Sequence, residues 1–278
     1  MSAPSIDDVD FRDLMRLEPH GPDTFVGIVA RYPWGNRLFG GQVVAQALRA
    51  AIHTVDPERR PHSLHSYFIR PGSPDEPVRF EVERLRDGRS FSTRQVVARQ
   101  SGGAILNLSV SFQVAEDEAD AQIAEIPDSV LEPDDPALLD YSWGAMLDRK
   151  AADSESGQIG YWIRLSAELG DDPDLHLCAL AFLSDAAPSR AGRSTHPDFE
   201  NRPSDRFKFI GASLDHSIWF QRPSRADEWH WFGTRSHGLS GGRGLVTGDA
   251  VTRSGLHALS FSQEVLLRRR RDERAPES

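Results

Sequence analysis

Cysteine and long apolar runs are the features that this sequence lacks most clearly. Cys178 is the single cysteine among 278 residues, which excludes a disulfide framework and a cysteine-rich metal site. No apolar run approaches the roughly 20 residues that a membrane helix requires, so we expect no membrane span. The first residues carry neither the basic patch nor the apolar stretch of a secretory signal. These absences predict a cytoplasmic, globular protein.

Positive charge is scarce relative to negative charge, with 32 Lys and Arg against 42 Asp and Glu and a formal net charge of −10. This balance argues against a general nucleic-acid-binding surface. A basic run at residues 268–271 follows the last apolar segment, and we expect residues 271–278 to form a disordered tail. Cys178 lies within the apolar stretch 175–183, which favours a small core residue over a nucleophile.

The sequence contains an internal repeat. Residues 65–71 return as residues 216–223, and residues 108–111 return as residues 259–262. Both pairs share an offset of 151 positions (216 − 65 and 259 − 108). Because chance matches would seldom keep one offset, we expect two related modules that are fused into one unit.

One position of the repeat changes from apolar to polar. Phe112 belongs to an apolar stripe on one face of an expected strand, and its counterpart in the second half is Gln263. A polar side chain within such a stripe costs about 1–3 kcal/mol unless it finds partners. Gln263 is therefore the first residue for which the pattern indicates chemistry.

Periodicity predicts the same order of elements in both halves. Apolar residues at helical spacing indicate helices over 42–52 and 175–185, and alternating runs bounded by turn residues indicate strands. The expected strands are 25–29, 62–69, 78–86, 90–100 and 104–114 in the first half and 161–164, 210–221, 228–236, 242–252 and 256–266 in the second. This pattern is typical of an α+β fold in which an antiparallel sheet packs on a long helix, once in each half.

Composition places the boundaries between these units. Residues 115–156 are rich in Asp, Glu and Pro and lack sustained periodicity, so we interpret them as a surface linker. Residues 1–114 then form the first repeat, and residues 157–270 form the second.

Four segments stand out by their residues, order and spacing: 39–48 (FGGQVVAQAL), 62–72 (HSLHSYFIRPG), 86–91 (RDGRSF) and 214–223 (LDHSIWFQRP). In these segments the sequence resembles the acyl-CoA thioesterase II family, and the likeness spans nearly the whole chain. The resemblance implies a double hotdog fold, in which two copies of a sheet are each wrapped round a helix. It also implies an acyl-CoA substrate, hydrolysis without a covalent intermediate, self-association, and no metal or redox cofactor.

The resemblance further implies that an aspartate, a serine or threonine hydroxyl and a glutamine hold the attacking water. The matching positions in this sequence are Asp185, Ser213 and Gln263. Ser213 departs from the threonine that is usual in the family, and it lacks the methyl group that restricts χ1.

The residue types suit these roles. Asp185 closes an apolar segment, where burial would raise the pKa and the basicity of its carboxyl group. Gln263 can accept a hydrogen bond from water through its carbonyl and can donate one through its amide. Structural roles are the alternative: a helix-terminal carboxylate for Asp185, an ordinary strand residue for Ser213 and a core amide for Gln263.

Gly40 and Gly41 open the first expected helix. We expect the backbone N–H of Gly41 or Gln42 to approach the acyl carbonyl, because helix N-termini carry free N–H groups and glycine permits close approach. The alternative is that both glycines only allow the helix and the sheet to pack closely.

Other features of the sequence suggest different chemistry. Residues 238–242 match the G-x-S-x-G nucleophile elbow, but a strand rather than a helix is expected to follow, which favours a loop serine. His62 and His65 could suggest a metal site, but strand geometry is expected to place them on opposite faces. Asp215 and His216 are expected to face opposite sides likewise, so we expect structural roles for all three histidines.

Two further functions fit parts of the pattern. A hotdog enoyl-CoA hydratase would need an aspartate near a histidine, and the set Asp185, Ser213 and Gln263 argues against it. A non-catalytic acyl-CoA-binding protein would keep the fold without turnover. Several arginines could bind the phosphates of coenzyme A, since guanidinium suits bidentate phosphate contacts: Arg70, Arg86, Arg222 and Arg243.

Overall fold

The computed structural model describes residues 3–143, 145–200 and 208–270. Its helices in these ranges are η1 (Ile6–Asp8), α1 (Phe11–Leu14), α2 (Gly40–Ile52), α3 (Pro173–Ser184) and α4 (Pro188–Ser194). Its strands in the first part of the chain are β1 (Leu17–Pro19), β2 (Thr24–Gly27), β3 (Arg59–Phe68), β4 (Val78–Asp87), β5 (Phe91–Gln100) and β6 (Gly103–Val114). The later strands are β7 (Leu147–Ala151), β8 (Ile159–Leu165), β9 (Phe209–Ser213), β10 (Asp215–Phe220), β11 (His230–Ser240), β12 (Arg243–Thr252) and β13 (His257–Arg269).

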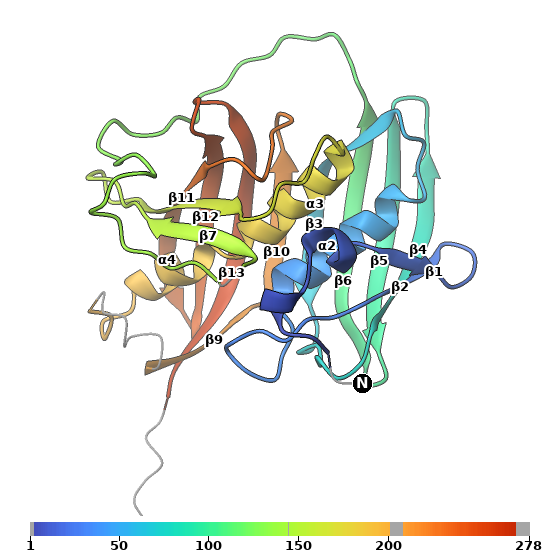
Figure 1. Ribbon diagram of the computed structural model, residues 1–278, viewed down its shortest axis with the longest axis horizontal. Coiled ribbons are helices and arrows are strands. Elements are labelled where there is room, and N and C mark those ends of the chain that lie inside the picture. The colour runs from blue at the N-terminus through green and yellow to red at the C-terminus, as the bar shows by residue number, and fades with distance from the viewer. Residues whose placement is uncertain (1–2, 144, 201–207, 271–278) are drawn as a thin grey trace, which may run out of the picture.

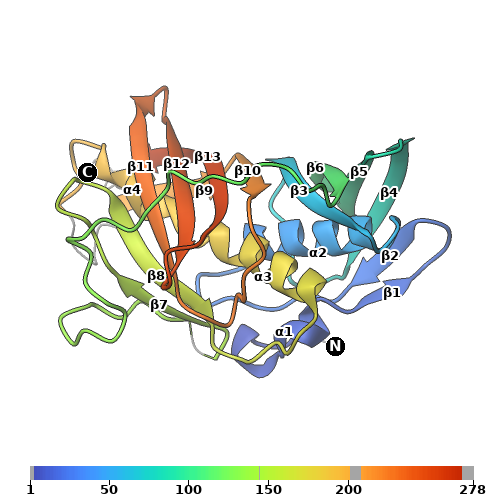
Figure 2. The ribbon, with the colours of Figure 1, turned by 90° about the horizontal axis from the view of Figure 1, so that it is seen from above.

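The strands form one antiparallel sheet in the order β1-β2-β4-β5-β6-β3-β10-β13-β12-β11-β8-β7, and β9 also pairs with β13. The two halves of the chain meet where β3 pairs with β10, with Ser66 opposite His216. On either side of this central pair the strands follow in mirrored order, β6-β5-β4 and β13-β12-β11. The sheet lies behind the helices in Figure 1, and Figure 2 shows that it curves around them.

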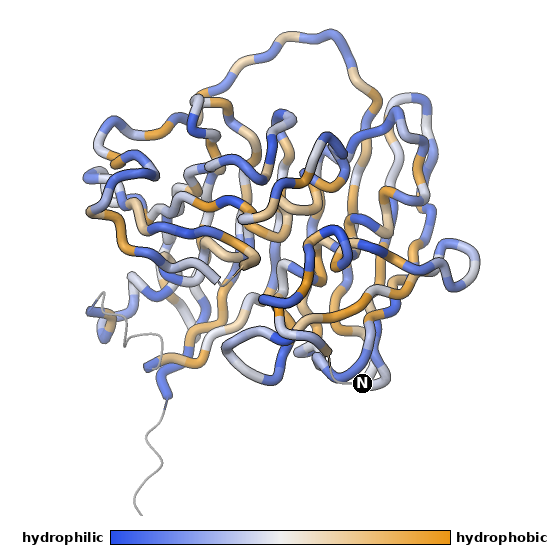
Figure 3. The backbone as a smooth tube through the Cα atoms, viewed as in Figure 1, coloured by the Kyte–Doolittle hydropathy of each residue, from blue (hydrophilic) through white to orange (hydrophobic). Residues whose placement is uncertain are grey.

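Helices α2 and α3 lie side by side against the curved sheet (Figures 1 and 2). The apolar spacing of α2 buries Val44, Ala47, Leu48 and Ala51 completely. α3 begins where the side chain of Asp172 accepts from two backbone N–H groups of its first turn. Hydrophobic stretches in Figure 3 follow these helices and the strands behind them, while many of the connecting loops are hydrophilic.

The two long helices run antiparallel, so the start of α2 lies beside the end of α3. At the opposite end of the pair, Arg49 of α2 lies 3.5 Å from the Asp172 carboxylate that caps α3. The ring of Phe182 in α3 packs edge-on against Phe39 and Phe11, with centroid separations of 5.0 and 5.5 Å. This aromatic contact fixes the point at which the N-terminus of α2 meets the C-terminus of α3.

Two buried glutamines anchor α2 to the chain that precedes it. Gln46 Nε2 donates to the carbonyls of Leu14 and Ile28, both at 2.8 Å. Gln42 Nε2 donates to Ile28 at 3.2 Å, and its Oε1 accepts from the Tyr32 hydroxyl at 2.9 Å. The Leu14 carbonyl is buried and the Ile28 carbonyl is partly buried, so the amides supply their hydrogen bonds and set the rotation of α2 about its axis.

Most helices and strands expected from the sequence are present, but two segments differ: 210–221 and 115–156. The single strand expected over 210–221 is two strands, β9 and β10, because the register against β13 shifts by one residue between Ser213, opposite Val265, and Ser217, opposite Ser262. Strand β7 lies within the segment 115–156, and the expected tail 271–278 lies outside the described residues. No helix in the described ranges is long and apolar enough to cross a membrane.

The expectation that His62 and His65 point to opposite faces is wrong. A register shift in β3 at His62 inserts an extra residue, which reverses the alternation of side chains beyond that point. His62 Nε2 therefore lies 2.8 Å from the hydroxyl of Ser111, and His65 Nδ1 lies 3.1 Å from that of Ser217, on the same face of the sheet. No cluster of three metal-ligating side chains occurs among the residues that the structure describes.

Replacing Gln46 by leucine should lower the free energy of unfolding by about 1–3 kcal/mol, because the buried Leu14 carbonyl would lose its donor and the Ile28 carbonyl would keep only the longer hydrogen bond from Gln42. Urea unfolding followed by circular dichroism measures this change. Gln221→Leu serves as the matched control, since Gln221 is exposed. Equal effects of the two substitutions would contradict the anchoring role of Gln46.

Candidate active site

Asp185 follows directly on α3 and is its C-cap residue. Its carboxylate accepts from the backbone N–H of Gly41 at 2.8 Å and from the hydroxyl of Ser213 at 2.9 Å. Only 8% of the residue is exposed. The carboxylate therefore lies between the C-terminus of one long helix and the N-terminus of the other, and the positive end of the α2 dipole faces it.

Ser213 and Gln263 reach the carboxylate from two paired strands. Ser213 ends β9 and lies opposite Val265 of β13, two residues beyond Gln263. Gln263 Nε2 donates to Ser213 Oγ at 2.7 Å, and Ser213 Oγ donates to Asp185. The structure thus brings the three residues expected from the sequence into one hydrogen-bonded set.

Burial raises the pKa of the Asp185 carboxyl to about 6, and hydrogen bonds from Ser213, Gly41 and Gln263 oppose part of that shift. Desolvation wins because the charged form loses more from leaving water than three donors return to it. A carboxylate with this pKa is mostly ionised at pH 7 and is a stronger base than a solvent-exposed aspartate.

The Gln263 side chain is turned so that its amide nitrogen faces the carboxylate cluster. Its carbonyl oxygen is buried and has no hydrogen-bond partner among the described residues. The side chain as a whole is 1% exposed. In this orientation the group that can meet a water beside Asp185 is the N–H of the amide, whereas the sequence suggested contact through the carbonyl as well.

Gly41 contacts Asp185 itself. A Cβ at Gly41 would lie 2.5 Å from the Phe182 carbonyl oxygen, and one at Gly40 would lie 2.7 Å from Asp185 Oδ2. Both glycines thus permit the close approach of the two helix ends. The side chain of Gln42, by contrast, is committed to Tyr32 and Ile28.

Sequence reasoning missed the donor from Gly41, since nothing in the pattern of residues 39–48 indicates which acceptor its N–H meets. It also missed a buried contact behind the site, where Ser184 Oγ lies 2.7 Å from His216 Nε2. The available signal was the position of Ser184 immediately before Asp185 at the end of an apolar helix.

The other candidate nucleophiles do not have suitable surroundings. Ser240 ends β11, and Gly241 and Gly242 turn the chain directly into β12 with φ values of 56° and 74°. The motif at 238–242 is therefore a hairpin turn and not a strand-to-helix elbow. Complete burial raises the pKa of the Cys178 thiol to about 12, so it is inert.

Three of the four arginines considered for coenzyme A have partners within the protein. Arg222 binds Asp120, Arg243 binds Glu264 at 2.9 Å, and Arg70 donates to the Ala104 carbonyl. Arg70 and Arg243 are exposed, whereas the side chain of Arg222 is only 14% exposed.

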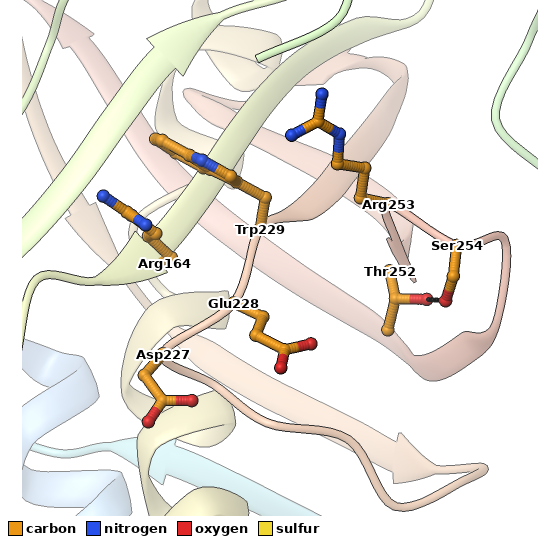
Figure 4. Close-up of a pocket in the computed structure, with 7 residues that line it drawn as sticks. All are labelled: Arg164, Asp227, Glu228, Trp229, Thr252, Arg253 and Ser254. Atoms are coloured by element: carbon orange, nitrogen blue, oxygen red, sulfur yellow. Dashed lines mark hydrogen bonds between the residues drawn. The ribbon is translucent and has the colours of Figure 1, made fainter. Parts of the chain in front are cut away.

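A separate surface groove lies around Trp229 (Figure 4). The guanidinium of Arg164 stacks over the Trp229 ring, with its carbon 4.6 Å from the ring centroid. Thr252 and Ser254 are joined by a hydrogen bond on the far side of the groove. None of the residues that line it is a hydrogen-bond partner of the Asp185 carboxylate described above.

Two family models match the chain. One describes an acyl-CoA thioesterase N-terminal domain and matches residues 29–113, and the other describes an acyl-CoA thioesterase C-terminal domain and matches residues 116–267. Acyl-coenzyme A thioesterase 8 from Mus musculus is 34% identical over 92% of this chain and 88% of its own length. Acyl-CoA thioesterase 2 from Haemophilus influenzae is 32% identical over 84% of this chain and 88% of its own length.

Solved structures give the same result for the fold. An acyl-CoA thioesterase II from Mycobacterium marinum superposes with a TM-score of 0.80 at 34% identity, covering 95% of this chain and 99% of that one. A protein with a hot dog fold from Alicyclobacillus acidocaldarius superposes with a TM-score of 0.72 at 19% identity over 94% of this chain and 98% of that one. The second likeness concerns the fold alone.

Replacing Asp185 by asparagine should stabilise the protein at about pH 8, by up to about 3 kcal/mol. The pKa of the carboxyl is about 6 in the folded protein against a model value of 3.8. The folded state therefore binds this proton more tightly, and the stability that it contributes is lost as the pH rises through 6. The gain from asparagine should accordingly shrink as the pH falls towards about 4.

Urea unfolding of both proteins at several pH values measures that difference. Asp23→Asn is the control of opposite sign, because a hydrogen bond from Arg84 lowers the pKa of Asp23. A pH-independent difference between wild type and Asp185→Asn would contradict the raised pKa.

Proposed function

This chain belongs to the acyl-CoA thioesterase family and hydrolyses acyl-CoA thioesters, and we propose that it does so by direct attack of a water held at Asp185. The observation that carries this mechanism is the hydrogen-bonded set in which Gln263 donates to Ser213 and Ser213 donates to Asp185. We take water rather than Ser213 as the nucleophile, because the Ser213 hydroxyl is held on both sides: it donates to Asp185 and accepts from Gln263.

The fold is an antiparallel hotdog sheet with its helices, and we infer further that it consists of two repeats. The mirrored strand order around the β3–β10 pair and the common sequence offset of 151 positions support this. The repeats would span residues 1–114 and 157–270. On this inference, α2 and α3 are the equivalent helices of the two units.

In the proposed reaction the water donates one proton to Asp185 and accepts a hydrogen bond from the amide of Gln263. The water oxygen attacks the thioester carbonyl carbon as Asp185 takes the proton, which gives a tetrahedral intermediate with a negative oxygen. Its collapse breaks the carbon–sulfur bond, and the proton passes from Asp185 to the departing thiolate. The products are the free acid and coenzyme A, and the carboxylate is regenerated.

The developing oxyanion requires donors, and the N-terminus of α2 supplies them in this proposal. Since the N–H of Gly41 is donated to Asp185, the next free N–H of that helical turn, on Gln42, is the candidate donor to the acyl oxygen. In this proposal Gly41 contributes by positioning the base, because its N–H donates to the Asp185 carboxylate.

Thiol release from short-, medium- and long-chain acyl-CoA tests the mechanism. Asp185→Asn should lower kcat/KM by at least about 100-fold, and Gln263→Ala by about 10–100-fold. The wild-type kcat/KM should fall as the pH drops below about 6, because the pKa of Asp185 is about 6 and only the ionised carboxylate accepts the proton. Ser240→Ala is the control and should retain full activity.

Unchanged rates in both Asp185→Asn and Gln263→Ala would remove the proposed site while leaving the activity intact. Absence of thiol release from every chain length, with water instead added to crotonyl-CoA, would contradict hydrolysis.

The hydroxyl at position 213 should matter more than the methyl group that the family usually has there. Ser213→Ala removes both the donor to Asp185 and the acceptor for Gln263, so kcat should fall by about 10–100-fold. Ser213→Thr keeps both hydrogen bonds and restricts χ1, so kcat should stay within about threefold of wild type. Steady-state kinetics on one acyl-CoA measures both, and equal losses in the two variants would contradict a role for the hydroxyl.

A further inference from the structure

His216 lies directly behind the site and is completely buried. It belongs to β10, and its Nε2 lies 2.7 Å from the hydroxyl of Ser184, the residue before Asp185. Its Nδ1 is buried and has no hydrogen-bond partner among the residues that the structure describes. An unpaired ring nitrogen in the interior is costly, so its surroundings need an explanation.

Gln263 presents the complementary group. β10 pairs with β13, with Ser217 opposite Ser262, so His216 and Gln263 occupy the next opposed positions and face the same side of the sheet. Gln263 Oε1 is the buried oxygen that lacks a partner. Burial lowers the pKa of His216 to about 4, and the side chain of Gln263 opposes part of that shift, as expected for a polar neighbour beside the ring.

A neutral imidazole carries one N–H, and its position decides whether both groups are satisfied. With the proton on Nδ1, the ring is placed to donate to Gln263 Oε1. Nε2 then accepts from the Ser184 hydroxyl, which turns to it from the Ala181 carbonyl that the same hydroxyl reaches at 2.9 Å. With the proton on Nε2, the lone pair of Nδ1 would face the lone pairs of Gln263 Oε1. The first tautomer gives a hydrogen-bond partner to both buried atoms, His216 Nδ1 and Gln263 Oε1. The second tautomer leaves both without one.

We propose that His216 is a positioning residue: its Nδ1–H donates to Gln263 Oε1 and thereby holds the Gln263 amide with its N–H groups towards Ser213 and the attacking water. This role deepens the proposed thioesterase mechanism and rests on it. Without the imidazole donor the Gln263 amide could rotate by 180°, and its oxygen would then face the Ser213 oxygen and the site.

The assignment gives every hydrogen bond of the site one direction. In the structure Gln263 donates to Ser213 and Ser213 donates to Asp185. The proposed tautomer adds two steps before them, in which Ser184 donates to His216 and His216 donates to Gln263. Each donor is polarised by the one before it, and the series ends on the carboxylate that takes the proton from water. His216 therefore acts on the base through two intervening side chains and does not touch the substrate.

The proton position is measured directly by ¹⁵N NMR of the full chain labelled at histidine. The His216 signal is identified among the 10 histidines by its disappearance in His216→Phe. The expected spectrum at pH 7 has a protonated Nδ1 and an unprotonated Nε2. A protonated Nε2 with a free Nδ1 would overturn the proposal whatever the protein hydrolyses, so this arm is independent of the proposed function.

Kinetics of three variants separate positioning from packing. His216→Phe keeps the ring shape and removes both nitrogens, so kcat should fall by about 30-fold with KM within about threefold of wild type. His216→Asn keeps a donor at the Nδ1 position and should recover most of kcat. His230→Phe is the control, because His230 is also completely buried and its ring bonds Ser224 and the Glu228 carbonyl instead.

His230→Phe should lose stability to urea but not kcat per folded molecule. Equal kcat in wild type and His216→Phe would overturn the proposal, as would equal losses in His216→Phe and His216→Asn when both are folded. If the wild type releases no thiol at all, the proposed function fails, and the NMR result still decides the orientation of Gln263.

Discussion

The buried negative charge of Asp185 is the constraint around which this molecule is arranged. A carboxylate withdrawn from water needs several donors, and no single element can supply them. Here they come from the N-terminus of α2, from β9 and from β13. The sheet must therefore join both halves at the β3–β10 pair, and α2 must start where α3 ends. Gly40 and Gly41 lack side chains at that point because a Cβ would occupy the space of Asp185 or of Phe182.

Much of the fold could be predicted from the sequence, because periodicity reports directly on burial. The helix over 42–52 is confirmed by α2, and the strands of the first half are confirmed within a few residues. The split between β9 and β10 could not be predicted, since a one-residue register shift leaves no compositional trace. The same holds for the shift at His62, where alternation alone gave the wrong face.

For the candidate site, the sequence predicted which residues to consider but not how they contact one another. The identities of Asp185, Ser213 and Gln263 came from a family resemblance, and the rise in the pKa of Asp185 followed from its apolar neighbours. The hydrogen-bond partners did not follow, because they depend on which atoms meet in three dimensions. Neither the N–H of Gly41 nor the ring of His216 could be assigned to the cluster from spacing, since each comes from a distant element. The sequence could indicate which side chains to consider as candidates, whereas the orientation of an amide or of a proton requires the fold.

The two ends of the antiparallel pair α2 and α3 make different polar contacts. At one end the Asp185 carboxylate accepts a hydrogen bond from the N–H of Gly41. At the other end Arg49 forms an ion pair with Asp172, which caps α3. The two halves of the sheet also differ in polarity. The offset of 151 positions pairs Gln263 in the second half with Phe112 in the first, and Phe112 is completely buried. The pair thus has a buried carboxylate at one end and an ion pair at the other. Under the proposed mechanism the stoichiometry follows: each chain carries one turnover centre, although it carries two long helices.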